Sequence, residues 1–298
     1  MVRTAVLPVA GLGTRFLPVT KSVPKELLPV VDRPAIQYIV EECVDNGVDD
    51  VLFVTATGKS AMEDHFDRRL DLEAALADKG KDAELALVRD LAELATIHSV
   101  RQGEALGLGH AILQGAEHVG PDGSFAVLLG DDLLEPGCDF LGRMIEAHER
   151  TGRPVIALME VPQDQVHLYG AAEVEPTDRD GEFRVTSMVE KPPPGEEPSN
   201  LIMVGRYVLP GSIFEVLRST PPGRGGEIQV TDALQACAQE EPIVGLKLDV
   251  PRYDTGDKLG YLKANLQFAA ARDDLGPELV AWLRDWLGED AAVGADPR

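Results

Sequence analysis

The sequence predicts an α/β protein with a Rossmann-like, mostly parallel central sheet, helices on both faces of it, and a smaller β-rich part. Two observations predict this class. Short, continuously apolar segments alternate with helical patterns through the first half of the chain, which is typical of a parallel sheet covered on both faces. After about residue 150, closely spaced strand signals replace this alternation, and Pro-containing turns separate them.

The elements of the first half follow from local signals. Residues 2–9 form an apolar run that ends at glycines, which predicts a strand. Pro34 begins a helix because its fixed φ suits the helix start, and Gly47 ends that helix as a left-handed cap. A charged helical stretch follows at about 59–94. Further strands are predicted at 51–54, 96–100 and 125–129, and a helix at 109–117.

The elements of the second half are predicted from the same local signals. Strands are predicted at 155–161, 169–175, 183–190, 201–209 and 243–248, and helices at 212–218, 230–239, 257–271 and 277–287. On the last helix Trp282, Leu283 and Trp286 form an apolar stripe, which we expect to pack inside the molecule. We predict one domain over 1–298, with parts at about 1–135 and 136–256, C-terminal helices at about 257–288 and a frayed tail at 289–298.

Composition limits the function. The chain of 298 residues is 44% hydrophobic and 27% charged, enough for a sizeable core, and its formal net charge is −23. A surface with this much negative charge repels nucleic acid and anionic membranes, and we therefore expect neither as a partner. It also repels a nucleoside triphosphate, which would need local cations and a divalent metal. Three scattered cysteines and the lack of a membrane-length apolar run favour a cytoplasmic protein.

The loop after the first strand is the most informative segment. Gly11 and Gly13 let the backbone approach a ligand closely and turn N–H groups toward phosphate oxygens. Three cations follow, Arg15, Lys21 and Lys25. This combination predicts a site for a nucleoside triphosphate.

Two familiar phosphate-binding motifs do not match this loop. A P-loop needs four residues between its glycines and a Gly-Lys-Ser/Thr ending, which are absent. A dinucleotide site needs a third glycine where Phe16 stands, although Asp32 lies where a ribose-binding acid would. Pro18, Pro24 and Pro29 also prevent the long helix that such a site requires. An ordinary Gly-rich turn would account for the glycines but not for the cations.

Carboxylates at two places in the chain are candidates for a metal site. Asp131 and Asp132 follow the strand at 125–129, and Asp254 also lies between a strand and a helix. In open α/β sheets ligands bind beyond the carboxyl ends of the strands, and Mg²⁺ prefers carboxylates together with phosphate oxygens. A polar turn accounts for the Asp-Asp pair equally well. A helix N-terminal acid, favoured by the helix dipole, is the simpler role for Asp254.

Several spaced motifs together resemble the sugar-1-phosphate nucleotidylyltransferases, and most closely the bacterial UTP–glucose-1-phosphate uridylyltransferases. They are Gly-Leu-Gly-Thr-Arg at 11–15, Pro-Lys-Glu-Leu-Leu-Pro-Val at 24–30, Gln102 with Gly-Leu-Gly-His-Ala at 107–111, Glu-Lys-Pro at 190–192, Val-Gly-Arg-Tyr at 204–207 and Asp-Thr-Gly-Asp-Lys-Leu-Gly-Tyr at 254–261. The resemblance covers about residues 3–286. It implies uridylyl transfer from UTP to α-D-glucose 1-phosphate, with Mg²⁺, in a homo-oligomer (tetramer or dimer).

The resemblance also assigns the site residues, with the nucleotide and metal in the part at about 1–135 and the sugar phosphate in that at about 136–256. For the nucleotide they are Ala10, Gly11, Gly13, Thr14, Gln102 and Gly107; for the phosphates Arg15, Lys25 and Lys191; for the sugar Gly170, Glu190 and Val204; and for the metal Asp131 and Asp254, with Asp132 pointing elsewhere. Taken alone, Glu190 with Lys191 reads as a solvated surface pair and Gln102 as a surface residue. Thymidylyl transfer on the same sugar phosphate and a non-catalytic nucleotide-sensing subunit remain alternatives.

Overall fold

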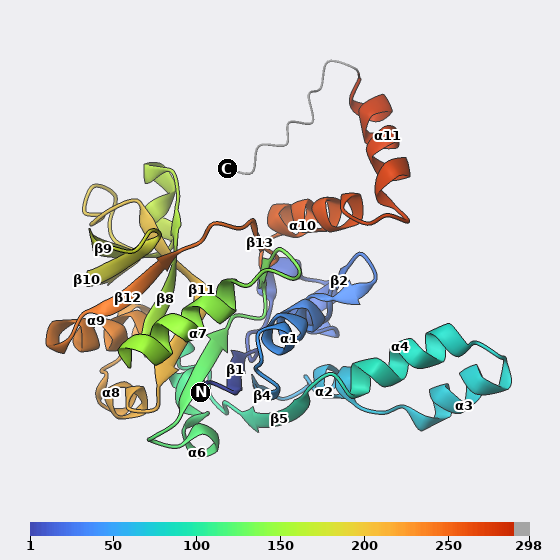
Figure 1. Ribbon diagram of the computed structural model, residues 1–298, viewed down its shortest axis with the longest axis horizontal. Coiled ribbons are helices and arrows are strands. Elements are labelled where there is room, and N and C mark those ends of the chain that lie inside the picture. Colours follow the sequence, from blue (N-terminus) through green and yellow to red (C-terminus); the bar gives the residue numbers. More distant parts are fainter. Residues whose placement is uncertain (289–298) are drawn as a thin grey trace.

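The computed structural model describes residues 1–288, and the predicted tail at 289–298 lies outside them. The α/β class is confirmed by a central nine-stranded sheet of order β5-β4-β1-β6-β11-β8-β12-β10-β9 (Figure 1). Its strands are β1 (Thr4–Pro8), β4 (Asp50–Thr55), β5 (Thr96–Arg101), β6 (Ser124–Leu128), β8 (Val155–Glu160), β9 (Gly170–Pro176), β10 (Glu182–Glu190), β11 (Leu201–Pro210) and β12 (Ile243–Lys247). The small sheets β2 (Pro29–Val30) with β3 (Arg33–Pro34) and β7 (Asp132–Leu134) with β13 (Arg252–Asp254) lie beside it.

The sheet is mixed, which corrects the expectation that it is mostly parallel. The parallel description holds for β5, β4, β1 and β6, and for the pair β8–β12. Between β6 and β8 the strand β11 is antiparallel to both, and β10 is antiparallel to β12 and β9. Only five residues separate β9 from β10, and a connection so short permits only antiparallel pairing. The β-rich part therefore continues the same sheet.

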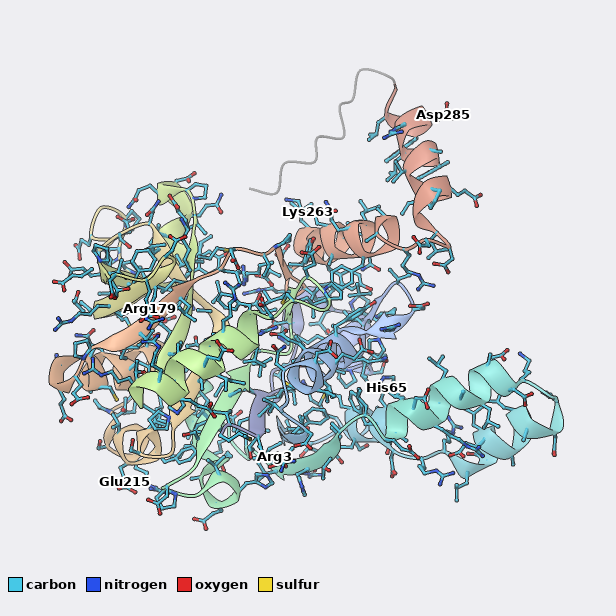
Figure 2. The ribbon with its side chains drawn as sticks, viewed as in Figure 1. Arg3, His65, Arg179, Glu215, Lys263 and Asp285 are labelled. Carbon is cyan, nitrogen blue, oxygen red and sulfur yellow. The ribbon has the colours of Figure 1, made fainter. Side chains whose placement is uncertain are left out.

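Helices cover both faces of the sheet. Alternation along β1 shows how: Ala5 and Leu7 belong to one buried cluster, whereas Val6 belongs to the other. The first cluster also takes residues from α1 (Ala35–Asp45), α2 (Ala61–Phe66), α7 (Phe140–Thr151) and α10 (Lys258–Ala270). The second takes residues from α5 (Leu108–Leu113), α8 (Ile213–Ser219) and α9 (Val230–Glu240). Side chains fill the space between these layers (Figure 2).

Two parts of the chain differ from the sequence expectations. The helix α7 was not predicted, although Gly152 ends it with a left-handed φ of 68°. The stripe on α11 (Gly276–Leu287) was expected to be core, yet Trp282 is 55% and Trp286 is 68% exposed. The two indole rings stack on each other, with centroids 5.5 Å apart. The expectation was wrong because α11 extends away from the sheet and reaches no core surface that could cover the rings (Figure 1).

The charged stretch 59–94 forms α2 and then an arm of two helices, α3 (Leu70–Asp78) and α4 (Asp82–Ala92), which projects from the body (Figure 1). Glu73 of α3 links this helix to Arg68, which precedes it, and to Arg89 of α4. Its carboxylate accepts hydrogen bonds from Arg68 at 2.5 and 2.9 Å and from Arg89 of α4 at 2.9 Å. None of the helices in the described residues combines the length and apolarity that a bilayer crossing requires.

The arm is expected to loosen in acid. Hydrogen bonds from Arg68 and Arg89 lower the pKa of Glu73 from 4.5 to about 2. A lowered folded-state pKa stabilises the fold above the unfolded pKa, and this contribution is lost as the pH falls from about 4.5 toward 2. The protection factors of amides 70–92, which correct for the slower intrinsic exchange in acid, should therefore fall over this range. Glu73→Gln should exchange fast already at pH 6, and superimposable pH profiles for the two proteins would contradict this role.

Candidate active site

The glycine loop begins where β1 ends, at the carboxyl edge of the parallel strands. Val9 N–H donates to the carbonyl of Val54 at 2.9 Å, and Gln102 N–H donates to that of Thr55 at 3.0 Å, so the residues after β1, β4 and β5 are neighbours. Three short 3-10 turns follow the loop, η1 (Thr14–Phe16), η2 (Val19–Lys21) and η3 (Lys25–Leu27), and no long helix forms before α1. The effect predicted for the prolines is confirmed.

Lys25 lies against this loop. Gly13 has a left-handed φ of 64°, and a Cβ there would lie 3.0 Å from Cβ of Lys25 and 3.2 Å from Cγ2 of Thr20. Thr20 Oγ1 donates to the carbonyl of Gly13 at 2.8 Å, which fixes the turn. A larger residue at 13 would displace the stem of Lys25. The Lys25 side chain therefore lies against the backbone of the glycine loop at Gly13.

Four predicted residues gather here, and we name Arg15, Lys25, Asp131 and Asp254 the cation–carboxylate group. Lys25 Nζ pairs with Asp131 Oδ2. Arg15 donates to the carbonyl of Gly256 at 3.3 Å. A Cβ at Gly256 would lie 2.6 Å from Asp131 Oδ2 and 2.9 Å from Asp254 Oδ1, so both carboxylates face the same glycine.

The electrostatics distinguish the two acids. Burial opposes ionisation of Asp131, but Lys25 outweighs it, and the pKa of this carboxyl is lowered. Burial raises the pKa of Asp254, and the neighbouring charge of Asp131 adds to the effect, while Arg252 and the Gly256 N–H oppose it. A cation between the two acids would relieve the repulsion that Asp254 experiences. Two adjacent carboxylates of this kind are oxygen donors that suit Mg²⁺.

Asp132 points elsewhere, as predicted. Its carboxylate accepts hydrogen bonds from Gly205 N at 2.9 Å and from Arg252 Nε at 2.5 Å. Asp257, and not Asp254, is the N-cap of α10 and accepts hydrogen bonds from Leu259 N and Gly260 N. Asp254 instead ends β13, paired with Asp132 of β7. It therefore has no helix-capping role to account for its position.

Sequence reasoning missed a buried ion pair beneath the loop. Glu26 is 1% exposed and Lys59 is 7% exposed. Lys59 Nζ lies 2.9 Å from Glu26 Oε2 and donates to the carbonyl of Val9 at 2.5 Å. The pair therefore joins the end of β1 to the turn that carries Lys25. A signal existed, because Glu26 stands inside the Pro-Lys-Glu-Leu motif and Lys59 follows a strand after Gly58.

Gln102 and Gly107 lie together at the end of β5. Gln102 Nε2 donates to the carbonyl of Gly107 at 3.1 Å and lies 3.2 Å from His110 Nδ1. Gly107 has a φ of 103°, and a Cβ there would meet Glu227 Cβ at 2.7 Å and the Ile228 carbonyl at 2.8 Å. Glycine is thus required at 107 by the neighbouring chain segment, whatever binds beside it.

The predicted sugar-phosphate residues form a second group at the ends of β9 and β10. Gly170 is paired with Glu190, and a Cβ at 170 would lie 3.1 Å from Glu190 Oε2. Glu190 accepts a hydrogen bond from Thr231 Oγ1 at 2.7 Å and lies 3.5 Å from Lys191 Nζ. Lys191 itself has a φ of 47°, a strained conformation for a residue with a side chain. Val204 is buried in the core, so only its backbone can face a ligand.

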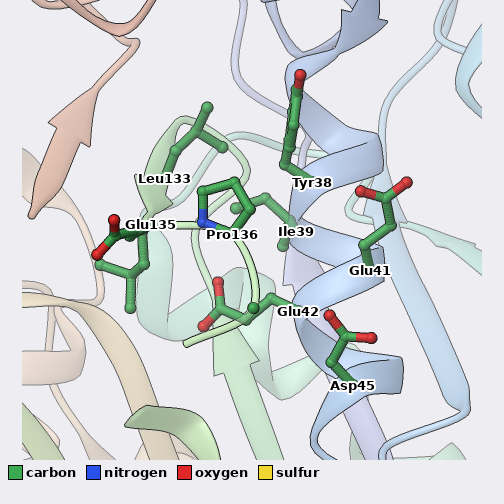
Figure 3. A pocket seen from close by; sticks show the side chains of 10 residues that line it. Tyr38, Ile39, Glu41, Glu42, Asp45, Leu133, Glu135 and Pro136 are labelled. Atoms are coloured by element: carbon green, nitrogen blue, oxygen red, sulfur yellow. The ribbon is translucent and has the colours of Figure 1, made fainter. Parts of the chain in front are cut away.

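Arg252 connects the two groups. It bonds Asp132, lies 3.9 Å from Asp254, and stands over the ring of Tyr169 at 6.0 Å. Tyr169 precedes Gly170, and its carbonyl accepts from Lys191 N at 3.0 Å. Elsewhere, a pocket lies between α1 and the turn after β7, and acids including Glu41, Glu42 and Glu135 line it (Figure 3). None of the predicted site residues lines that pocket.

Comparisons with known proteins match almost the whole chain. The chain matches a model of the nucleotidyl transferase family over residues 4–271. It is 46% identical over 285 residues to the UTP–glucose-1-phosphate uridylyltransferase YngB of Bacillus subtilis, covering 95% of each chain. It is 43% identical over 290 residues to another protein of that organism named UTP–glucose-1-phosphate uridylyltransferase, covering 97% of this chain and 98% of the other.

Solved structures show the same likeness. A UTP-bound UGPase from Acinetobacter baumannii superimposes with a TM-score of 0.88 at 42% identity, covering 95% of this chain and 99% of the other. A UDP-glucose pyrophosphorylase complexed with UDP-glucose superimposes with a TM-score of 0.81 at 38% identity, covering 91% and 100%. The first of these two neighbours is bound to UTP and the second to UDP-glucose.

Proposed function

The chain belongs to the nucleotidyl transferase family, and on that basis we propose that it transfers the uridylyl group of UTP to α-D-glucose 1-phosphate, giving UDP-glucose and pyrophosphate. The relatives named for this reaction are 46% and 43% identical to it over almost the whole chain. The observation that carries the proposal is the meeting of Arg15, Lys25 and Asp131 beside the glycine loop.

The reaction forms a bond between a phosphate oxygen of the sugar and the α-phosphorus of UTP, and breaks the bond from that phosphorus to the bridging oxygen. The attacking oxygen is already an anion, so no general base is required. The obstacle is repulsion between two polyanions, and positioned cations reduce it. We assign Arg15 to the β- and γ-phosphates and Lys25 to the α-phosphate. Gly13 and Thr14 hold the triphosphate through backbone N–H groups.

A divalent metal fits the two carboxylates of the cation–carboxylate group, Asp131 and Asp254. Both point to Gly256, and the raised pKa of Asp254, caused first by burial and further by Asp131, favours a bound cation. We propose Mg²⁺, which would neutralise phosphate charge as pyrophosphate leaves. Lys25 would hold Asp131 ionised before the metal enters, because its charge lowers the pKa of that carboxyl against burial.

At the other end of the site, Glu190 is assigned to the sugar hydroxyls and Lys191 to the attacking phosphate. Gly170 lets the sugar lie against the backbone, and Val204 contributes a backbone contact. Thr231 fixes the Glu190 carboxylate by a hydrogen bond of 2.7 Å, which leaves its orientation defined before substrate binds.

Lys191→Ala should raise the KM for glucose 1-phosphate by at least about 10-fold, because a charge-assisted contact is worth about 1.5–3 kcal/mol. The KM for UTP should change little. Initial rates at varied glucose 1-phosphate and saturating UTP measure the effect. The control is Lys247→Ala on β12, which lies beside the first residues of β10 and not beside its last. An unchanged KM for the sugar phosphate would remove Lys191 from this role.

The uracil edge is assigned to the backbone of Ala10 and Gly11 and to the amide of Gln102, with Gly107 beside the base.

A pyrophosphate-release assay with glucose 1-phosphate and each nucleoside triphosphate tests the whole proposal. UTP should give the highest kcat/KM, and omission of Mg²⁺ should abolish release. Preference for dTTP would establish the thymidylyl alternative, and binding of UTP without release would establish the sensing subunit.

We also propose a cytoplasmic homo-oligomer, either tetramer or dimer, built partly with the C-terminal helices. The stacked, exposed pair Trp282–Trp286 on α11 supports this, since it is a large apolar surface without cover in the single chain. We propose that the part at about 1–135 binds the nucleotide and the metal, and that the part at about 136–256 binds the sugar phosphate. Light scattering with Trp286→Ser would test the contact.

A further inference from the structure

A second cluster of chemically active side chains lies away from the candidate active site. Asp50 of β4, His98 of β5 and His118 of α6 (Ala116–Val119) place their ligand atoms within 4.8 Å of one another. His118 Nε2 is 3.0 Å from Asp50 Oδ2, and His98 Nε2 is 3.5 Å from Asp50 Oδ1. The imidazole centroids are 4.8 Å apart. Among the described residues, this is the only His, Cys, Asp and Glu cluster with such spacing.

The fold determines why these three meet. In the parallel pairing of β4 with β5, His98 is opposite Leu52, two residues after Asp50. Side chains two apart on a strand share a face, so Asp50 and His98 point to the same side of the sheet. The short helix α6 lies on that side and supplies His118. Asp50 is the first residue of β4, so the cluster is at the amino edge of the sheet, opposite the glycine loop.

The observed spacing suits a tetrahedral ion. With metal–ligand distances of about 2.0–2.2 Å, tetrahedral ligand atoms are about 3.4 Å apart. Measured from one carboxylate oxygen, Asp50 Oδ1, the separations are 3.1 Å to His118 Nε2 and 3.5 Å to His98 Nε2, and they bracket that value. Thr4 Oγ1 donates to Asp50 Oδ2 at 2.8 Å, the kind of outer hydrogen bond that orients a ligating carboxylate. The neighbouring Arg3 (labelled in Figure 2) donates its hydrogen bonds of 2.8 and 3.0 Å to the carboxylate of Asp49, not to that of Asp50.

We propose that Asp50, His98 and His118 bind one divalent transition-metal ion, with Zn²⁺ the best match. Two imidazoles and one carboxylate are donors that suit zinc, whereas Mg²⁺ takes oxygen ligands. The side chains of His98, His118 and Asp50 are 48%, 25% and 31% exposed, so water can reach the ion and complete its coordination. The ion would cross-link β4, the outermost strand β5 and α6. Its role is structural, and it is independent of the proposed activity.

The test uses the full chain after chelator treatment and dialysis. Calorimetric titration with ZnCl₂ should show one saturable ion per chain in the presence of millimolar Mg²⁺, and the Tm should rise with Zn²⁺. His98→Ala and His118→Ala should each weaken binding more than about 10-fold, since even outer-shell losses cost 10- to 100-fold. His167→Ala, a histidine outside the cluster, serves as the control and should bind like the parent.

Co²⁺ provides an independent readout, because its visible absorption reports the ligand set. The parent and His167→Ala should give the intense bands of a tetrahedral nitrogen–oxygen site, and both cluster variants should lose them. Binding that is equal in all four proteins, or absent from the parent, overturns the proposal and leaves only a hydrogen-bonded His–Asp cluster. His98 is the most exposed of the three ligands, so His98→Ala should fold normally, and a fall in affinity there cannot be assigned to misfolding if its circular dichroism matches the parent.

Discussion

Lys25→Ala is expected to lower kcat by about 10²- to 10³-fold, the scale on which a positioned charge stabiliser acts in a transition state. In the proposed reaction Lys25 is the cation assigned to the α-phosphate; its stem lies against Gly13 and its ammonium pairs with Asp131. Its loss has a second effect. The partly buried carboxylate of Asp131 would keep its charge with no adjacent ammonium, and would then repel the triphosphate that we propose binds beside it.

The measurement is pyrophosphate release at saturating UTP and glucose 1-phosphate, over a range of Mg²⁺ concentrations. Lys263→Ala removes an exposed lysine on α10 (labelled in Figure 2) and controls for the change in net charge. Lys25→Arg keeps the charge but alters its reach, and should recover part of the rate. If Lys25→Ala turned over like Lys263→Ala, the assignment of Lys25 to the α-phosphate would be wrong.

The sequence predicted those parts of the site that local rules determine. Asp131 follows an apolar strand, and the carboxyl-edge rule for open sheets placed it near the glycine loop. The prolines after the loop predicted the absence of a long helix there. In both cases the physical cause lies within a few residues of the feature, so the feature can be predicted from the sequence without knowing the fold.

Features that depend on distant partners could not be predicted in this way. Whether Lys59 is a solvated helical lysine or a buried one depends on Glu26 and on the end of β1, which only the folded chain brings together. The requirement for glycine at 107 comes from Ile228, more than a hundred residues away. Likewise, the stripe on α11 has the spacing of a core helix, and only its position in space shows that no core surface reaches it.

Lys59→Met is expected to destabilise the fold by about 3–5 kcal/mol, because it leaves the Glu26 carboxylate buried without a partner. Burial lowers the pKa of Lys59 and raises that of Glu26, so desolvation already opposes both charges in the intact pair. Urea unfolding measures the loss. Lys79→Met, at an exposed position after α3, should stay within about 0.5 kcal/mol of the parent.

The double variant Glu26→Leu, Lys59→Met separates stability from function. Replacing both charges by apolar groups removes the unpaired carboxylate, so most of the lost stability should return. Activity should not return with it. Lys59 Nζ also donates to the carbonyl of Val9, which precedes the proposed uracil contacts at Ala10 and Gly11, and no apolar side chain can replace that bond. A raised KM for UTP in a stable double variant is therefore the expected result. Parent-like kinetics would show that the pair supports the fold alone, and a double variant as unstable as Lys59→Met would show that the buried charge of Glu26 is not the cause.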